Sequence, residues 1–313
     1  MSEPIRYRGR IAQIRICLGK LLRMFLYQND WKALPMAAII AGLVTFAVGN
    51  NLFKTQEGTL SGCFSLVCVC IWNGFFNSIQ VVCRERPIIK REHRSGMHIS
   101  SYIIAHMIYQ MLLCLAQTVI LLGICYIAGI RYPSHGLVTG QFIIDFGISM
   151  FLITYSADMI SLAISCIVKN TTTAMTVMPF MLIFQLIFSG TLIYLDGPAE
   201  KLTSFTIAKW GLQDLCALCD YNSQPNVTMW NTAWQFREME IDGVQPVKII
   251  MDSVLEDNKL DDVLLESGKY NQKEEYAPTA ENVLKCWAWM GGIAILFAAV
   301  AVGSLEFIDR DQR

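Results

Sequence analysis

The feature that most constrains the fold is the alternation of long apolar runs, nearly free of charged residues, with short charged segments. A helix needs about 20 mostly apolar residues to cross the hydrocarbon core of a bilayer, and several runs reach that length. Only 16% of the 313 residues are charged and 54% are hydrophobic, whereas a soluble domain has about 25% charged residues. The sequence therefore predicts an all-α integral membrane protein.

Six membrane spans are predicted, and they divide the chain into segments. A cytoplasmic arm with a basic amphipathic helix occupies residues 1–30, and that helix is expected to lie in the membrane interface. Spans one to five fall within residues 31–195, a long polar extracellular segment with re-entrant helices covers 196–282, and a cytoplasmic tail covers 306–313. The predicted spans are residues 31–53, 60–82, 99–127, 141–168, 174–195 and 283–305.

The distribution of basic residues predicts the orientation. Lysines and arginines gather in the N-terminal arm, in the loop 83–98 and in the tail, whereas the alternate short loops hold only Lys54 and Arg131. Short loops rich in lysine and arginine stay in the cytoplasm. We therefore expect a multi-pass protein of the plasma (cytoplasmic) membrane with both termini inside and residues 196–282 outside.

Catalytic and metal-binding motifs are absent from the sequence. It contains no phosphate-binding loop, no serine nucleophile elbow and no paired-histidine zinc motif, and its four histidines are scattered. The chain alone is therefore not expected to be an enzyme or to hydrolyse ATP. Cys216 and Cys219 form a C-x-x-C pair in a polar stretch; a local disulfide or plain thiols is favoured over zinc, because no second pair accompanies them.

Asp158 lies inside the fourth predicted span, where an ionisable group is costly. It could be a proton or cation site, or a carboxylate hydrogen-bonded to a neighbouring helix. The second interpretation is favoured, since no second intramembrane charge pairs with it. A proton-coupled transporter that uses Asp158, and a non-transporting membrane sensor or scaffold, stay open as alternatives.

The charged loop 83–98 interleaves acidic and basic residues more regularly than an ordinary positive-inside loop. A rigid charged helix at this place would suit docking on a soluble partner. Residues 85–105, ERPIIKREHRSGMHISSYIIA, resemble the segment between spans two and three in the G-type (white/pleiotropic-drug-resistance) branch of type-2 ATP-binding-cassette exporters. In that family the segment is the coupling helix, so the resemblance implies a coupling role for Glu85, Arg86, Lys90, Arg91, Glu92, Arg94 and Gly96.

Two further motifs carry the same resemblance. Residues 188–195, FSGTLIYL, are similar to the outer gate of the family, which implies a gate formed by Phe188, Leu192 and Leu195. Residues 208–215 and 220–222 are similar to an outer motif that follows span five, most like bacterial members whose ATPase carries a forkhead-associated domain. The order of the spans agrees with the family throughout.

The resemblance implies an alternating-access exporter built from two membrane chains and two ATPases. Because only a short arm precedes the first span, the ATPase is expected on a separate chain, where it would bind ATP and Mg²⁺; no cofactor is expected in this chain. The second membrane chain would be a copy of this one or a close relative, and no nucleic acid is expected as a partner. By analogy the cavity for an amphipathic, lipid-like or peptide-like cargo is lined by Asn73, Phe76, Asn77, Gln80, Phe180, Phe184 and Gln185.

Overall fold

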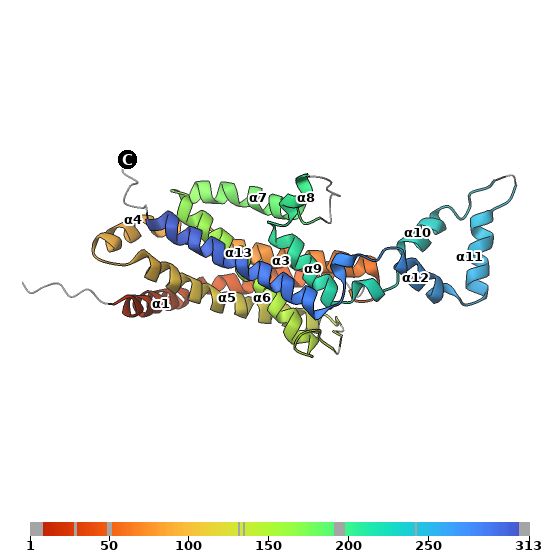
Figure 1. The fold of residues 1–313 in the computed structure, drawn as a ribbon, viewed down its shortest axis with the longest axis horizontal. Helices are drawn as coiled ribbons and strands as arrows, with labels where there is room; N and C mark the ends of the chain where they lie inside the picture. The colour runs from red at the N-terminus through yellow and green to blue at the C-terminus, as the bar shows by residue number, and fades with distance from the viewer. Residues whose placement is uncertain are drawn as a thin grey trace, which may run out of the picture.

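The computed structural model describes residues 9–27, 30–48, 52–130, 132–133, 135–190, 198–241 and 243–306. Within these ranges the regular structure is helical, apart from one isolated bridge between Ile241 and Val244. The predicted all-α class is therefore confirmed. Figure 1 shows an elongated molecule, in which long helices run side by side and a group of short helices projects from one end.

Four described segments are long and apolar enough to cross a membrane. They are the stretch Gln56–Arg94, which contains α3 (Gln56–Ser78) and α4 (Val81–Arg94), together with α5 (Ile99–Ile127), α6 (Phe142–Ile167) and α13 (Ala280–Glu306). α2 (Ala33–Val48) and α7 (Thr171–Ile187) are apolar but shorter. The predicted first and fifth spans are thus shorter helices than expected, with residues 49–51 and 191–195 outside the described part of the chain.

The predicted second span begins too late in the sequence. α3 starts at Gln56, where the Thr55 hydroxyl accepts a hydrogen bond from the Gly58 amide at 3.2 Å and caps the helix. The polar Gln56 is nevertheless fully buried, because its side-chain amide donates to the Gly268 carbonyl at 3.0 Å. A contact between residues so distant in sequence is invisible in the local hydropathy.

α6 occupies the centre of the bundle, against α3 on one side and α13 on another. α3 and α6 meet at Gly74, where a Cβ atom would lie 2.3 Å from the Thr154 carbonyl oxygen and 2.8 Å from the Ala157 Cβ. Small residues allow this kind of close backbone approach between membrane helices. Phe75, Phe146 and Ile153 are fully buried in the core that forms around the contact.

The segment between α7 and α13 divides into two parts. α9 (Ile207–Leu218) packs against α3, α6 and α13, and all of its residues except Lys209 are buried. The remaining helices are α8 (Pro198–Thr203), α10 (Thr228–Gln235), α11 (Pro246–Glu256) and α12 (Leu260–Lys269). α10, α11 and α12 extend away from the bundle (Figure 1).

Candidate functional site

The charged segment after α3 folds as the predicted helix, α4, together with the turn 95–98 that leads into α5. The helix has one buried face, formed by Val82, Cys83, Glu85 and Ile89. Val82 and Ile89 pack with apolar residues of α5, α6 and α13 in a small second core. Arg84, Arg91 and Arg94 are exposed on α4, so the helix presents charge outward while its apolar face holds it on the bundle.

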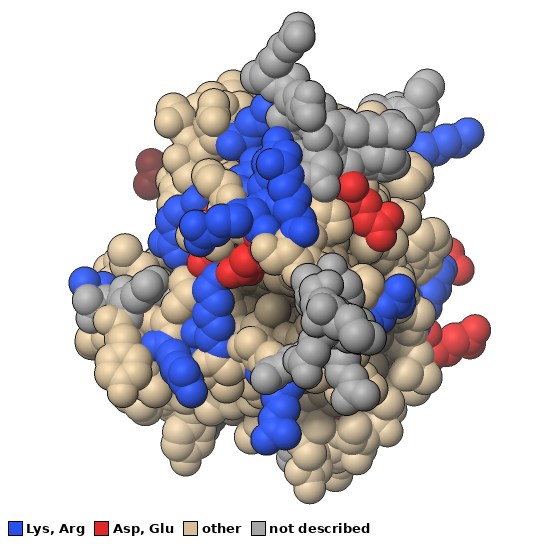
Figure 2. All heavy atoms as spheres, turned by 90° about the vertical axis from the view of Figure 1, so that its left-hand side faces the viewer, with Lys and Arg blue, Asp and Glu red and all other residues tan. Residues whose placement is uncertain are grey.

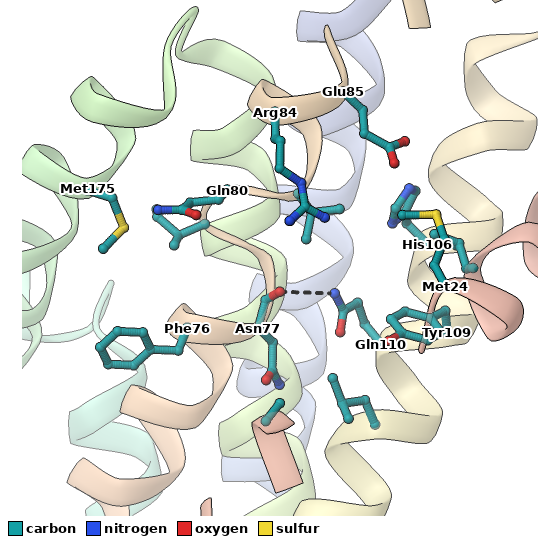
Figure 3. Close-up of a pocket in the computed structure, with 15 residues that line it drawn as sticks. Met24, Phe76, Asn77, Gln80, Arg84, Glu85, His106, Tyr109, Gln110 and Met175 are labelled. Carbon is teal, nitrogen blue, oxygen red and sulfur yellow. Dashed lines mark hydrogen bonds between the residues drawn. The ribbon is translucent and has the colours of Figure 1, made fainter. Parts of the chain in front are cut away.

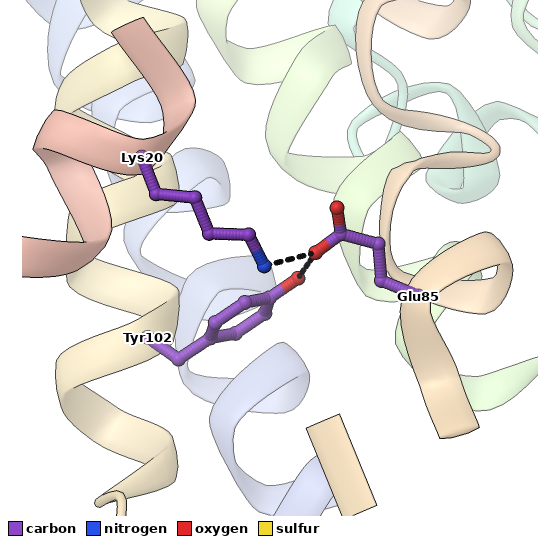
Figure 4. Close-up of polar contacts among 3 residues, drawn as sticks. All are labelled: Lys20, Glu85 and Tyr102. Atoms are coloured by element: carbon purple, nitrogen blue, oxygen red, sulfur yellow. Dashed lines mark hydrogen bonds and ion pairs between the residues drawn. The ribbon is translucent and has the colours of Figure 1, made fainter. Parts of the chain in front are cut away.

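Glu85 is the one acidic residue on the buried face, and only 7% of it is exposed. Its Oε2 atom lies 3.3 Å from Lys20 Nζ of α1 (Arg10–Tyr27) and accepts a hydrogen bond of 3.4 Å from the Tyr102 hydroxyl of α5. Figure 4 shows both groups converging on the same carboxylate oxygen. A carboxylate can be buried at modest cost only when it is paired in this way, so the contact joins three helices.

Arg86 links α4 to a fourth helix. Its Nη1 atom donates to the carbonyl oxygens of Cys166 at 2.8 Å and Val168 at 3.0 Å, at the C-terminal end of α6. Helix C-termini leave carbonyl groups without partners inside the helix, and a guanidinium group satisfies them favourably. Movement of α4 would therefore pull directly on the central helix of the bundle.

The turn after α4 is fastened to α1. Gln13 donates to the Gly96 carbonyl at 3.2 Å and accepts from the His98 amide at 2.9 Å. Gly96 has a φ of 100°, a conformation that glycine adopts readily. α1, α4 and the adjacent ends of α5 and α6 therefore form one connected unit at this end of the molecule.

Figure 2 faces that end and shows lysine and arginine side chains gathered around a hollow, with a few acidic groups among them. The predicted coupling residues Lys90, Arg91, Glu92 and Arg94 all belong to α4. Arg91 and Arg94 are exposed, whereas Lys90 and Glu92 are half-buried. α4 therefore carries charged side chains on its exposed face, while its opposite face is attached to the bundle.

The residues predicted to line the cargo cavity separate into two groups. Phe76 of α3 is 51% exposed and Phe180 of α7 is 69% exposed, so both rings point out of the protein. Phe76, Asn77 and Gln80 also border a cavity of about 310 Å³ between α1, α3, α4 and α5 (Figure 3).

Phe184, the remaining aromatic residue of the predicted cavity, packs against Phe188 of the predicted gate, with ring centroids 4.7 Å apart. Leu192 and Leu195 of the predicted gate lie outside the described residues.

Asn73 and Gln185 lie in the interior, away from any exposed face. Asn73 is 6% exposed and Gln185 is 2% exposed. Gln185 Oε1 accepts the Ile207 amide hydrogen at 2.9 Å, which caps the first turn of α9. The Gln185 carbonyl group is therefore engaged in holding α9 on α7.

Cys216 and Cys219 do not lie in a polar loop, which corrects the prediction. Both are buried on α9 and at its end, both are free thiols, and the Cys219 sulfur lies 3.8 Å from that of Cys63 on α3. Burial raises the pKa of Cys216 and of Cys219 above the usual value, which favours the protonated, unreactive form. Among the described residues no cluster of histidine, cysteine and acidic side chains could hold a metal ion.

Asp158 is fully buried on α6. Its Oδ2 atom lies 3.8 Å from the Cys114 sulfur of α5, and Asn77 and Gln117 exchange two hydrogen bonds beside it, at 2.8 and 3.0 Å. These polar groups link α3, α5 and α6 inside the bundle. The arrangement resembles the interhelical polar contacts that stabilise membrane proteins.

Sequence reasoning missed the partners of α4, namely Gln13, Lys20 and Tyr102. Lys20 stands on the polar face of an amphipathic helix and Tyr102 begins an apolar run, so neither carries a local signal of the contact with Glu85. It also missed His106 and Gln110, which are two of the polar residues in the largely apolar helix α5. Their polarity alone could have identified them as candidate functional residues, because polar residues inside a membrane span usually have a role.

Residues 12–201 match the ABC-2 type transporter family, and this match covers more than half of the chain. The chain therefore belongs to that family. The ABC transporter ATP-binding/permease protein Rv1747 of Mycobacterium tuberculosis is 25% identical to it over 178 residues. That similarity covers 53% of this chain and 20% of the relative, so the chain spans a minor part of the relative's length.

Proposed function

We propose that the chain is the membrane-spanning half of an ATP-driven exporter, and that an ATP-binding-cassette ATPase, with its ATP and Mg²⁺, docks on α4. The observation that carries the proposal is the anchoring of α4. Glu85 and Arg86 fix this charged helix to α1, α5 and α6, while Arg91 stays exposed. A partner that displaced α4 would move the whole connected unit. The likeness of residues 85–105 to the G-type branch supports the same role.

The proposed topology has six spans, with α2 and α7 as the two short ones. Both ends of the chain and α4 face the cytoplasm, and α10, α11 and α12 lie outside. Two features support this orientation: basic side chains gather at the α1 and α4 end (Figure 2), and the short helices project from the opposite end (Figure 1).

A second copy of the chain would complete the transport pathway. The exposed rings of Phe76 on α3 and Phe180 on α7 provide an apolar face that a partner subunit could cover. Such a face, with few charges, suits an amphipathic, lipid-like or peptide-like cargo. Phe188 at the end of α7 would belong to the outer gate, as the family likeness implies.

Co-purification from the native membrane in mild detergent tests the proposal. The bound proteins would be identified by mass spectrometry for the wild type, for Arg91→Glu on exposed α4, and for the matched control Lys54→Glu at the opposite end of α3. We expect an ATP-binding-cassette ATPase in stoichiometric amount with the wild type and the control, and its loss with Arg91→Glu. Recovery of no ATPase while the membrane chains stay paired would refute the proposal.

A further inference from the structure

The cavity of about 310 Å³ at the α1 and α4 end is lined by both polar and apolar side chains. Gln80, Arg84, His106 and Gln110 are among the polar residues, and Leu21, Met24 and Met175 are among the apolar ones. Figure 3 shows Arg84 reaching from α4 into the space that Gln80, Gln110 and His106 border, with Met24 beside His106 and Met175 beside Gln80. The cavity therefore offers polar and apolar contacts together, with a cationic group among the polar ones.

The charges that border the cavity favour an anion. The Arg84 guanidinium makes no hydrogen bond or ion pair with any other side chain in the part of the chain that the structure describes. Glu85 also borders the cavity, but its Oε2 atom is held by Lys20 and by Tyr102. The positive charge of Lys20 therefore offsets the negative charge of Glu85. The positive charge of Arg84 is not offset by any side chain among the described residues.

Two buried polar side chains that line the cavity have atoms without a hydrogen-bond partner among the described residues. His106 is fully buried, and neither of its ring nitrogens has a hydrogen-bond partner among the described residues. Gln110 is 1% exposed; its amide nitrogen donates to the Asn77 carbonyl at 3.4 Å, but its Oε1 atom has no partner there. Buried polar groups are almost always hydrogen-bonded. A bound molecule is therefore expected to accept a hydrogen bond from His106 and to donate one, as a headgroup hydroxyl can, to Gln110 Oε1.

The size of the cavity limits what can enter. A volume of about 310 Å³ is at the lower end of the range for small-ligand sites, so it accommodates a headgroup rather than a whole lipid. The apolar residues Leu21 and Met24 belong to α1, a basic amphipathic helix of the type that lies in the membrane interface. A lipid could place its headgroup at Arg84 while its chains stay among the helices.

We propose that this cavity binds the phosphate headgroup of an anionic phospholipid, with Arg84 and His106 as the groups that contact the phosphate. A guanidinium group recognises phosphate through paired, charge-assisted hydrogen bonds. The binding itself does not depend on the exporter proposal, whereas its assignment to the inner leaflet rests on the topology proposed above. A lipid at this place would wedge between α1 and α4, the two helices joined by Lys20 and Glu85.

Native mass spectrometry of the full chain, released from nanodiscs with equal amounts of phosphatidylglycerol and phosphatidylcholine, tests this proposal. The variants are Arg84→Gln, His106→Phe and, as a matched control, Arg91→Gln, which removes an exposed charge from the same helix. We expect the wild type and the control to retain phosphatidylglycerol preferentially. Arg84→Gln is expected to reduce that preference about tenfold, and His106→Phe is expected to reduce it as well.

Three results would overturn the proposal. Equal retention of the two lipids by the wild type would exclude an anionic site. Equal losses in Arg84→Gln and Arg91→Gln would indicate general surface charge rather than the cavity. Displacement of the lipid by millimolar inorganic phosphate would identify free phosphate as the ligand. Because no ATPase is needed in these measurements, their failure is distinguishable from a failure of the exporter proposal.

Discussion

Lys20 Nζ lies 3.3 Å from Glu85 Oε2, and this contact between residues 65 positions apart in the sequence joins α1 to α4. The Glu85 side chain is 10% exposed and the Lys20 side chain is 39% exposed, so the pair stands at the edge of the protein interior. Tyr102 completes the contact from α5. The charged helix α4 is thus attached to α1 as well as to α5.

A double-mutant cycle measures this attachment. Lys20→Met and Glu85→Gln, alone and together, are expected to show a coupling free energy of about 1 kcal/mol, because the partial exposure of Lys20 weakens the interaction. Thermal unfolding in detergent would report the stability of each variant. Strictly additive effects of the two substitutions would show that the ion pair contributes nothing to the attachment of α1.

Gly74 tests the packing of α3 on α6. Gly74→Ala places a Cβ atom 2.3 Å from the Thr154 carbonyl oxygen, so the helices must separate and the folded protein should lose about 1–3 kcal/mol of stability. Gly123→Ala on α5 is the control, since a Cβ atom there meets nothing within 4 Å. Equal melting temperatures for the two variants would contradict the close approach.

Asp158→Asn separates the exporter from a proton-coupled transporter. Asp158 lies among polar contacts between helices, and asparagine can preserve hydrogen bonding there. We expect ATP-driven export in inverted vesicles to retain most of its rate, with no dependence on a proton gradient. An export rate that follows the gradient and collapses in the variant would favour proton coupling.

Asp214 on α9 predicts a dependence of stability on pH. Burial raises the pKa of this carboxyl group to about 8, although Trp287 Nε1 donates to its Oδ2 atom at 3.1 Å. The folded protein then keeps a proton that an unfolded aspartate, with a pKa of about 3.9, has lost. Stability should therefore fall as the pH rises from about 4 to about 8 and level off above that.

Unfolding temperatures of the wild type, of Asp214→Asn and of Asp261→Asn across this range check that prediction. Asp214→Asn should reduce the slope of the profile, because the amide does not titrate. Asp261 is exposed on α12, so its substitution should leave the profile as in the wild type. A wild-type profile that rises between about pH 5 and about pH 8 would contradict this direction.

The hydropathy pattern predicted the long helices closely. The third predicted span coincides with α5, and α6 is one residue shorter at each end than the fourth. These apolar runs end in abrupt changes to polar residues. The residues at each helix end are therefore enough to predict where the helix ends. α4 was predicted as a charged helix for the same reason, since residues 83–98 are bounded by two apolar runs.

The tertiary contacts could not be predicted from the same pattern. Gln56 is polar in sequence but buried through Gly268, and Cys216 lies in a short helix that becomes apolar core only because α9 packs on the bundle. Glu85 was predicted to belong to a charged docking surface. Instead its side chain is buried and binds Lys20 and Tyr102, so that it joins α4 to α1 and α5. Local sequence composition does not predict that a residue is buried when the helix that covers it comes from a distant part of the chain.

Site-directed photo-cross-linking from α4 shows whether an ATPase docks on this helix. A photoreactive amino acid would replace Arg91 on α4 and, in a matched sample, Lys54 at the other end of α3, both of which are exposed. After illumination of native membranes, we predict a cross-link to an ATP-binding-cassette ATPase from position 91 and none from position 54. The absence of an ATPase from both positions, or its equal appearance at both, would contradict a docking surface on α4.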